Sequence, residues 1–262
     1  MHIEHRTAAA RRGFTLVELL VVVGIIALLV GLMVPALSRV RRASLATADL
    51  SNLRGLVAAH LSYMNSNEER FVDVGLPHGS VANPENSFVA RLQPYVGTSP
   101  LAYRSPLDES AHWSPELGGE GIPVVDGPVQ VWRRTSYGMN NYLSRTYSPA
   151  VALLGPGEGV DRMQQVAQPD RVACFLLMAE RGSFASADHP HVEDWANSPM
   201  PWRTAASQVQ VNAVDRGEPT GQSQSNYAFL DGRVATVPFQ DIYRSMQDNR
   251  LDPATCCPGG NQ

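Results

Sequence analysis

Lysine is missing from this chain of 262 residues, and all 21 of its basic residues are arginines. Acidic residues number 25, which gives a formal net charge of −4. The charges form neither a basic stripe nor a long acidic tail, so the sequence gives no indication of a nucleic-acid partner. We interpret the absence of lysine as a compositional bias, because arginine replaces it along the whole chain.

Cysteine is also scarce. The three cysteines are Cys174, Cys256 and Cys257, and no pair has the C-x-x-C spacing. This argues against a zinc ribbon, and the odd number gives no complete disulfide framework. Cys174 lies in an apolar stretch, where we expect a buried thiol. For the adjacent pair Cys256 and Cys257, a vicinal disulfide, a cross-link to another molecule and two free thiols all remain open.

The common sequence signatures of catalysis are absent as well. There is no Gly-x-Ser-x-Gly motif, no glycine-rich phosphate loop and no His-Glu-x-x-His motif. We therefore do not expect this chain to be an enzyme.

The 21 glycines and 19 prolines favour a loop-rich domain. The length allows one membrane segment together with one domain of about 200 residues, or with two small domains.

A long apolar run lies near the start of the chain, from Phe14 to Leu37, and its only clearly polar side chains are Thr15 and Glu18. As a straight helix, these 24 residues would measure about 36 Å, enough to cross the hydrocarbon core of a bilayer. The run is too long for a cleaved signal peptide, and an amphipathic pattern follows it instead of a cleavage site. Three arginines lie on each side, so the positive-inside rule does not decide the orientation.

Glu18 is the unusual residue of this run, because a carboxylate within lipid is costly and such residues usually have a partner and a function. The surrounding string Gly13-Phe14-Thr15-Leu16-Val17-Glu18-Leu19-Leu20 resembles the class III signal of type IV pilins and type II secretion pseudopilins. Pro35 is the 22nd residue counted from Phe14, a position at which pilins commonly have a proline that kinks the helix.

The resemblance implies a processing step. A membrane-embedded prepilin peptidase is expected to cut between Gly13 and Phe14 on the cytoplasmic side and to methylate the new amine of Phe14. Residues 1–13 would then be a leader, and residues 14–37 a transmembrane helix that stays in the mature protein. The protein would cross the bacterial inner membrane once, with its globular domain on the periplasmic or extracellular side.

The resemblance also implies assembly into a filament. Glu18 of one subunit is expected to face the Phe14 amine of its neighbour, where a low dielectric strengthens the attraction. The partners would be other pilin-like subunits and an inner-membrane assembly platform. A type II secretion pseudopilus and a type IV pilus-like fibre are both compatible with the sequence. The alternative is a membrane-anchored protein that binds carbohydrate or metal and does not polymerise.

Beyond Pro35 the helical pattern continues over residues 38–66, with apolar residues every three or four positions. We expect this amphipathic half to pack on a small, mostly antiparallel β-sheet with long loops. The predicted fold is therefore α+β and pilin-like. The β-rich domain would cover residues 67–247, and residues 248–262 would form a flexible tail.

Short strands are expected in this domain between turn-forming residues. The strongest signal is Asp231-Gly232, a pair that favours a two-residue hairpin turn between strands at 226–230 and 233–237. Further strands are expected at 129–133, 171–178 and 208–214.

Parts of this domain resemble a bacterial prepilin-type family named for a histidine that is followed, after nine residues, by Asp-Gly. The stretches that carry this second resemblance are Asn226 to Val234, Thr135 to Tyr142, and Gln168 to Val172 followed by Glu180. It would cover nearly the whole chain. Gly221 stands where the family has its histidine, so the role of that histidine cannot be transferred.

Three weaker patterns concern ligands. His189, His191 and Glu193 would share one face of an extended segment, which suits a metal ion, although a solvated polar loop is the simpler interpretation. Residues 248–252 offer oxygen atoms for calcium, as in the C-terminal loop of major pseudopilins, but lack the EF-hand spacing. No other cofactor is expected. Four tryptophans could contact sugars or belong to the core: Trp113, Trp132, Trp195 and Trp202.

Overall fold

The computed structural model describes residues 15–76, 78, 84–97, 100–126 and 129–256. The chain divides into two compact units, Met1–Ala43 and Ser44–Gln262. Helix α1, Leu16–Ser66, contributes to both, and its two parts are described separately below.

In the first unit, α1 is exposed at every residue from Leu16 to Arg41. Among the described residues, α1 is the one helix that is long and apolar enough to cross a membrane. Pro35 lies inside the helix without ending it, and the hydroxyl of Ser38 donates to the Pro35 carbonyl at 2.9 Å. Because proline has no amide hydrogen, the helix lacks one backbone hydrogen bond at this point.

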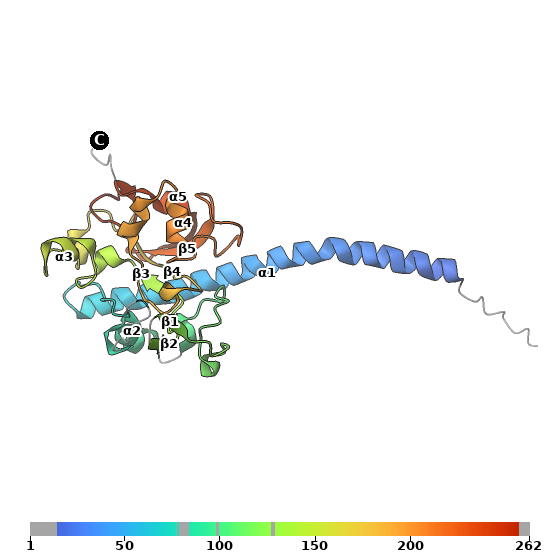
Figure 1. Ribbon diagram of the computed structural model, residues 1–262, viewed down its shortest axis with the longest axis horizontal. Coiled ribbons are helices and arrows are strands. Elements are labelled where there is room, and N and C mark those ends of the chain that lie inside the picture. The colour runs from blue at the N-terminus through green and yellow to red at the C-terminus, as the bar shows by residue number, and fades with distance from the viewer. Residues whose placement is uncertain (1–14, 77, 79–83, 98–99, 127–128, 257–262) are drawn as a thin grey trace, which may run out of the picture. The chain divides into compact units, whose positions relative to one another are not determined.

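The second unit contains the remaining part of α1 and a four-stranded antiparallel sheet in the order β3-β4-β5-β6 (Figure 1). Its strands are β3 Tyr137–Met139, β4 Ala173–Leu177, β5 Gln224–Phe229 and β6 Val234–Pro238. Two smaller antiparallel pairs are β1 Val124–Asp126 with β2 Val129–Val131, and β7 Tyr243–Ser245 with β8 Asp248–Asn249.

The helices of the second unit after α1 are short. The α-helices are α2 Phe88–Val96, α3 Pro149–Leu154, α4 Pro201–Ala205 and α5 Phe239–Ile242. The 3-10 turns are η1 Pro84–Asn86, η2 Pro100–Tyr103, η3 Pro115–Leu117, η4 Asn141–Leu143, η5 Met163–Gln165, η6 Ser183–Ala185 and η7 Val192–Asn197.

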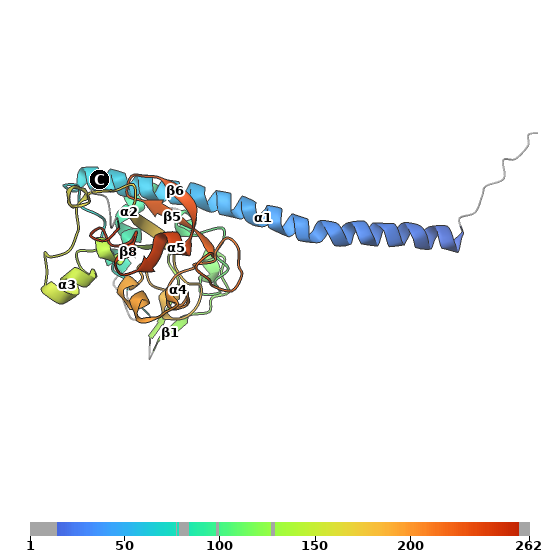
Figure 2. The ribbon, with the colours of Figure 1, turned by 90° about the horizontal axis from the view of Figure 1, so that it is seen from above.

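Both faces of the four-stranded sheet are buried. Along β4, Cys174 and Leu177 belong to a core shared with α1, whereas Ala173 and Leu176 belong to a second core. The α1 core contains Leu53, Leu56, Val57 and Met64, and the second core contains residues of α5 and η7. Figure 2 shows the sheet between α1 on one side and α4 and α5 on the other. A strand with two buried faces is apolar along its whole length, as β4 is.

The α+β, pilin-like fold class is confirmed: the chain has a long N-terminal helix with an apolar first part, followed by small antiparallel sheets and many loops. One predicted strand was wrong. Residues 208–214 form no strand but a single bridge from Val209 to Met178, because Val209 and Val211 fill the second core from an irregular segment. The short strand β3, which contains a glycine, was not predicted.

The globular domain extends beyond residue 248, where the flexible tail was expected to begin. Asp248 and Asn249 form β8, Leu251 is fully buried, and Cys256 is also buried. The Asn249 side chain accepts from the amides of Leu251 and Asp252, which fixes the turn that follows the strand. The expectation of a tail that starts at residue 248 is therefore corrected for residues 248–256.

Two polar residues lie within the buried stripe of α1. Asp49 accepts hydrogen bonds from Ser105, Tyr137 and Asn226, and burial raises its pKa above the ordinary value. His60 accepts from the amide of Val72 at 3.2 Å through Nε2, and burial lowers its pKa to about 3. The hydrogen bonds of Asp49 to Tyr137 of β3 and Asn226 of β5 join the second part of α1 directly to the sheet.

A buried ion pair joins the loops beside the sheet. Arg133 donates to Asp108 at 2.7 Å, and both side chains are fully buried. The guanidinium also donates to the carbonyls of Met178, Ala179 and Ala185. Burial disfavours the charged form of Asp108, but Arg133 and further hydrogen bonds outweigh it and lower the pKa of this carboxyl group.

Candidate functional site

The candidate site begins at the first turn of α1, where Thr15 and Glu18 cap the helix reciprocally. The Glu18 amide donates to the Thr15 hydroxyl at 3.2 Å, while Glu18 Oε2 accepts from the Thr15 amide at 2.9 Å and from its hydroxyl at 2.7 Å. This is the capping-box arrangement, which satisfies amides that the helix itself leaves free. It also fixes where the glutamate side chain stands at the helix start.

The second carboxylate oxygen, Glu18 Oε1, accepts no hydrogen bond from the residues that the structure describes. Glu18 is also the only charged residue between Thr15 and Ser38. Gly13 and Phe14, the residues expected to be processed, lie outside the described residues. The described part of the site is thus a single carboxylate at the start of an apolar helix, with one oxygen available to a group from elsewhere.

The helix surface that follows Glu18 is apolar on all sides. Leu16, Leu20 and Leu32 are exposed by 79%, 66% and 67%, and their neighbours are similarly exposed. Ordinary soluble proteins rarely present a contiguous apolar surface of this kind. Since burial of apolar surface stabilises by about 25 cal/mol per Å², this segment requires lipid or other protein around it.

The predicted hairpin turn, Asp231-Gly232, lies in the C-terminal part of the sequence. Asp231 and Gly232 form the turn between β5 and β6, and Asp231 Oδ1 accepts from the Arg233 amide at 3.0 Å. Gly232 has a φ of 92°, a conformation that favours glycine. These residues therefore have a structural task in the turn. Gly221 precedes β5, and its carbonyl accepts from the Gln240 amide at 2.8 Å.

The residues proposed as metal ligands lie together in part. The ligand nitrogens of His189 and His191 lie within 4.8 Å of each other and of His78, which comes from a distant part of the sequence. Glu193 lies behind this group, with its carboxylate 3.1 Å from Nδ1 of His191. His78 is the member that the sequence did not reveal, because it lies 111 positions before His189.

The oxygen atoms expected to suit calcium have partners within the protein. Asp248 lies 3.5 Å from Arg244, and Asp252 accepts from the Ala254 amide at 2.9 Å. Of the four tryptophans, for which sugar contact and core packing were both open, Trp113 and Trp195 are buried. Trp132 is 42% exposed. Cys174 is buried, and Cys257 lies outside the described residues.

A model of the prokaryotic N-terminal methylation motif matches residues 9–34 of this chain. No curated protein and no solved structure matches the chain. The motif supports a type IV pilin-like protein, with processing by a prepilin peptidase and assembly with other pilin-like subunits. Together with the long apolar helix, it is consistent with membrane anchoring in the cell envelope. It indicates a structural subunit rather than an enzyme.

Proposed function

We propose that this protein is a pilin-like subunit that assembles through the first part of α1 into a type II secretion pseudopilus or a type IV pilus-like fibre. Cleavage between Gly13 and Phe14 would release the leader, and methylation would modify the Phe14 amine. The observation that carries the proposal is the exposed apolar surface of Leu16 to Val40, which contains one carboxylate and no basic residue before Arg39.

The apolar surface accounts for two successive environments. Before assembly, the segment crosses the bacterial inner membrane, with the leader in the cytoplasm and the globular domain on the other side. In the filament, the same surface packs against equivalent segments of other subunits. Apolar side chains serve both states, because lipid tails and leucine side chains are similarly apolar.

Glu18 supplies the contact that apolar packing cannot provide, namely a fixed register. Its Oε2 is held by Thr15, and its Oε1 is left for a donor. After cleavage, Phe14 of a neighbouring subunit carries a charged amine, and methylation keeps that charge. An ion pair within an apolar bundle is strong, and an unpaired carboxylate there is costly, so subunits slipped out of register are disfavoured.

Capping and charge can be separated by three variants expressed in cells that carry the assembly machine. Glu18→Gln keeps a side chain that can complete the capping box but removes the charge. Thr15→Ala removes the cap partner and keeps the carboxylate. Glu18→Ala removes both functions. Assembly is measured by cross-linking of neighbouring subunits in intact cells and by recovery of the protein in sheared filaments.

We expect Glu18→Gln to lose assembly as fully as Glu18→Ala, whereas Thr15→Ala retains most of it. Cleavage of the leader should continue in all three variants, which serves as the control for membrane insertion. If Glu18→Gln assembled normally, the charge would have no function in the filament, and the proposal would fail. If both alanine variants assembled normally, the chain would be better described as an anchored protein that does not polymerise.

A further inference from the structure

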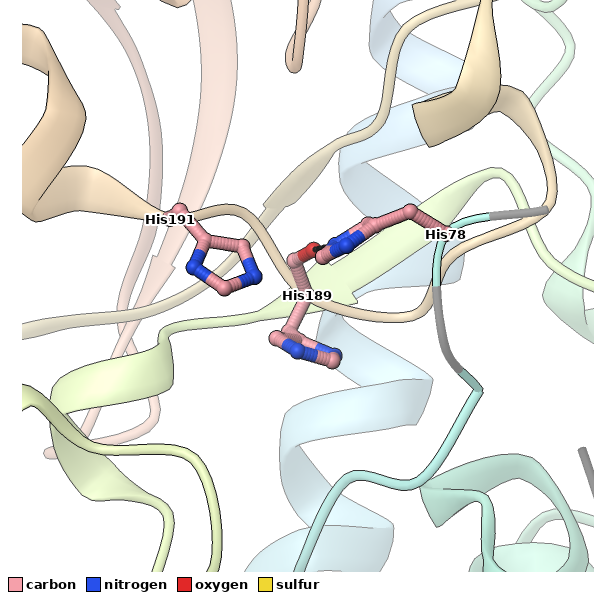
Figure 3. A group of neighbouring side chains, drawn as sticks. All are labelled: His78, His189 and His191. Carbon is pink, nitrogen blue, oxygen red and sulfur yellow. Dashed lines mark hydrogen bonds between the residues drawn. The ribbon is translucent and has the colours of Figure 1, made fainter. Parts of the chain in front are cut away.

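Three histidine side chains meet at the surface of the globular domain, far from the apolar helix segment in the sequence. His189 and His191 come from the loop between η6 and η7, and His78 comes from the segment that follows α1 (Figure 3). One ligand nitrogen from each ring lies within 4.8 Å of the others. The ring centroids of His78 lie 5.1 Å from His189 and 4.5 Å from His191.

Carboxylates orient two of the three rings from behind. Asp188 Oδ1 lies 3.0 Å from Nδ1 of His189, and Glu193 Oε1 lies 3.1 Å from Nδ1 of His191. With Nδ1 engaged in both rings, Nε2 is the nitrogen that remains for a metal. Histidine ligands in metalloproteins typically have such a carboxylate on the other ring nitrogen, which fixes the tautomer and makes the ligand more basic.

The supporting carboxylates are themselves held in place. Asp188 accepts from the amides of Gly75 and Leu76 at 3.0 Å, so the same residue that orients His189 also fixes the backbone leading to His78. Glu193 accepts from the Asn141 side chain at 2.7 Å. The carboxylates therefore hold two of the histidine rings, and backbone amides and Asn141 in turn hold the carboxylates, without any bound ion.

One ring nitrogen of the histidine group, Nε2 of His189, lacks a hydrogen bond to the described part of the protein. Nε2 of His189 is buried and has no hydrogen-bond partner among the residues described here, and the whole residue is only 1% exposed. A buried ring nitrogen without a partner is destabilising, because it has lost its hydrogen bonds to water. Native proteins rarely leave such a group unsatisfied without a bound water, an ion or a function.

The surroundings of the three rings are largely aromatic. Phe184 lies 4.0 Å from the His78 ring, and Tyr147 lies 4.7 Å from the His189 ring, measured between centroids. Aromatic walls lower the local dielectric and limit the entry of water, which strengthens the bond between a neutral imidazole and a cation. His191 remains 31% exposed and leaves a path for an ion from solvent.

We propose that His78, His189 and His191 bind a zinc ion, with a water molecule in the fourth position. Three neutral imidazoles suit Zn²⁺, which prefers nitrogen ligands at about 2.0–2.1 Å in tetrahedral geometry. Ligand nitrogens in such a site are about 3.3 Å apart. Ligand nitrogens that lie within 4.8 Å of one another must therefore approach by up to about 1.5 Å. His78 and His191 are both partly exposed, whereas His189 is buried.

Binding of zinc would join two segments that are distant in the sequence. The ion would tie the chain that leaves α1 to the loop between η6 and η7, and so add a cross-link to a part of the fold that is built largely from irregular structure. Because a metal that binds only the folded state stabilises it, the thermal midpoint of the domain should rise with zinc concentration.

The test uses the full-length protein, purified in detergent with a chelator and then dialysed free of it. Titration with ZnCl₂ by isothermal calorimetry should show one ion per chain. His191→Ala and His78→Ala should weaken the affinity by more than about 100-fold, and Glu193→Gln by about 10–100-fold, as is typical when the partner of a metal-bound histidine is removed. His112→Ala is the matched control, since His112 instead contacts the Ile122 carbonyl at 2.9 Å.

Both altered ligands are partly exposed, and so each variant should keep its metal-free thermal midpoint. That midpoint is measured in chelator by tryptophan fluorescence and separates loss of binding from loss of folding. The proposal is overturned if the wild-type chain binds no zinc, or if His191→Ala and His112→Ala bind it equally well.

Discussion

Two carboxylates on α1, Asp49 and Glu18, differ in where their hydrogen-bond partners come from. Asp49 is fully buried and accepts hydrogen bonds from three side chains of its own domain, Ser105, Tyr137 and Asn226. Glu18 is exposed, and its described hydrogen bonds go only to Thr15. The second part of the helix has its partners within the globular domain, whereas the first part presents an apolar surface and a charge whose one partner among the described residues is Thr15.

This difference predicts that the two parts of α1 contribute to different properties, the second part to folding and the first part to assembly. Changes around Asp49 should affect folding of the globular domain and leave assembly of correctly folded subunits unchanged. Changes at Glu18 should affect assembly and leave folding unchanged. Unfolding of the domain and cross-linking of subunits are therefore two separate measurements, and each of the following variants should move one of them.

The largest loss of folding stability is expected for Arg133→Met. The variant leaves the buried carboxylate of Asp108 without its cation and frees the carbonyls of Met178, Ala179 and Ala185. Loss of one partner of a buried ion pair typically costs about 3–5 kcal/mol. Urea unfolding followed by tryptophan fluorescence checks this. Arg134→Met, next in the sequence and exposed, is the control, and equal midpoints for the two variants would contradict the prediction.

Asp49→Ala should destabilise the domain by about 1–3 kcal/mol, because the donors of Tyr137 and Asn226 lose their acceptor inside the core. Glu18→Ala should leave the same unfolding midpoint unchanged. Each variant should therefore change only one measurement. Asp49→Ala should lower the urea midpoint, and Glu18→Ala should reduce cross-linking. A shared loss in both measurements would show that the two parts of α1 do not act separately.

Acid should weaken the globular domain through His60. Burial lowers the pKa of His60 from 6.5 to about 3, so the unfolded chain binds a proton below pH 6.5 that the folded chain does not. The stability contributed by neutral His60 is complete above pH 6.5 and is lost as the pH falls towards 3. Between pH 7.5 and 5.5 this loss amounts to about 1.4 kcal/mol.

His60→Gln should reduce this pH dependence by the same amount, because glutamine does not titrate and can still accept from the Val72 amide. Urea midpoints at the two pH values give the comparison. His112→Gln, at a residue outside the core, is the control. A His60→Gln variant with the full pH dependence of the wild type would show that other groups cause it.

The smallest effect is expected at the hairpin. Gly232→Ala forces a side chain into a conformation with a φ of 92° and brings a Cβ within 3.3 Å of Leu61. The expected loss is about 1 kcal/mol, measured as a shift in the urea midpoint with no change in cross-linking. Gly217→Ala has nothing within 4 Å of the added Cβ and serves as the control. An equal midpoint in both variants would contradict the strained turn.

Much of the helix could be predicted from the sequence because its signals are local. The string from Gly13 to Leu20 and the apolar run up to Leu37 need no knowledge of distant residues. The Thr-x-x-Glu spacing of Thr15 and Glu18 is also a local signal, typical of a capping box at the start of a helix. The apolar stripe of the second part includes Leu53 and Val57, which are both buried. Asp49 and His60 were missed, because their partners come from other elements of the fold.

The sheet and the histidine group were less predictable for the same reason. The alternation in residues 208–214 favours a strand, but these residues fill a core without pairing regularly. The short segment Tyr137–Met139 becomes a strand because it pairs with β4. Similarly, His189 and His191 are visible as neighbours in the sequence, but only folding brings His78 to them.

The proposed function places the first part of α1 in a processed subunit within a filament. The most direct test is mass spectrometry of the N-terminal peptide of this protein, recovered from filaments sheared from cells that express the wild-type chain. We predict a peptide that begins at Phe14 and is one methyl group heavier than the unmodified sequence. A chain that begins at Met1, or that is absent from the filament fraction while present in the membrane, would show that the protein is not a processed filament subunit.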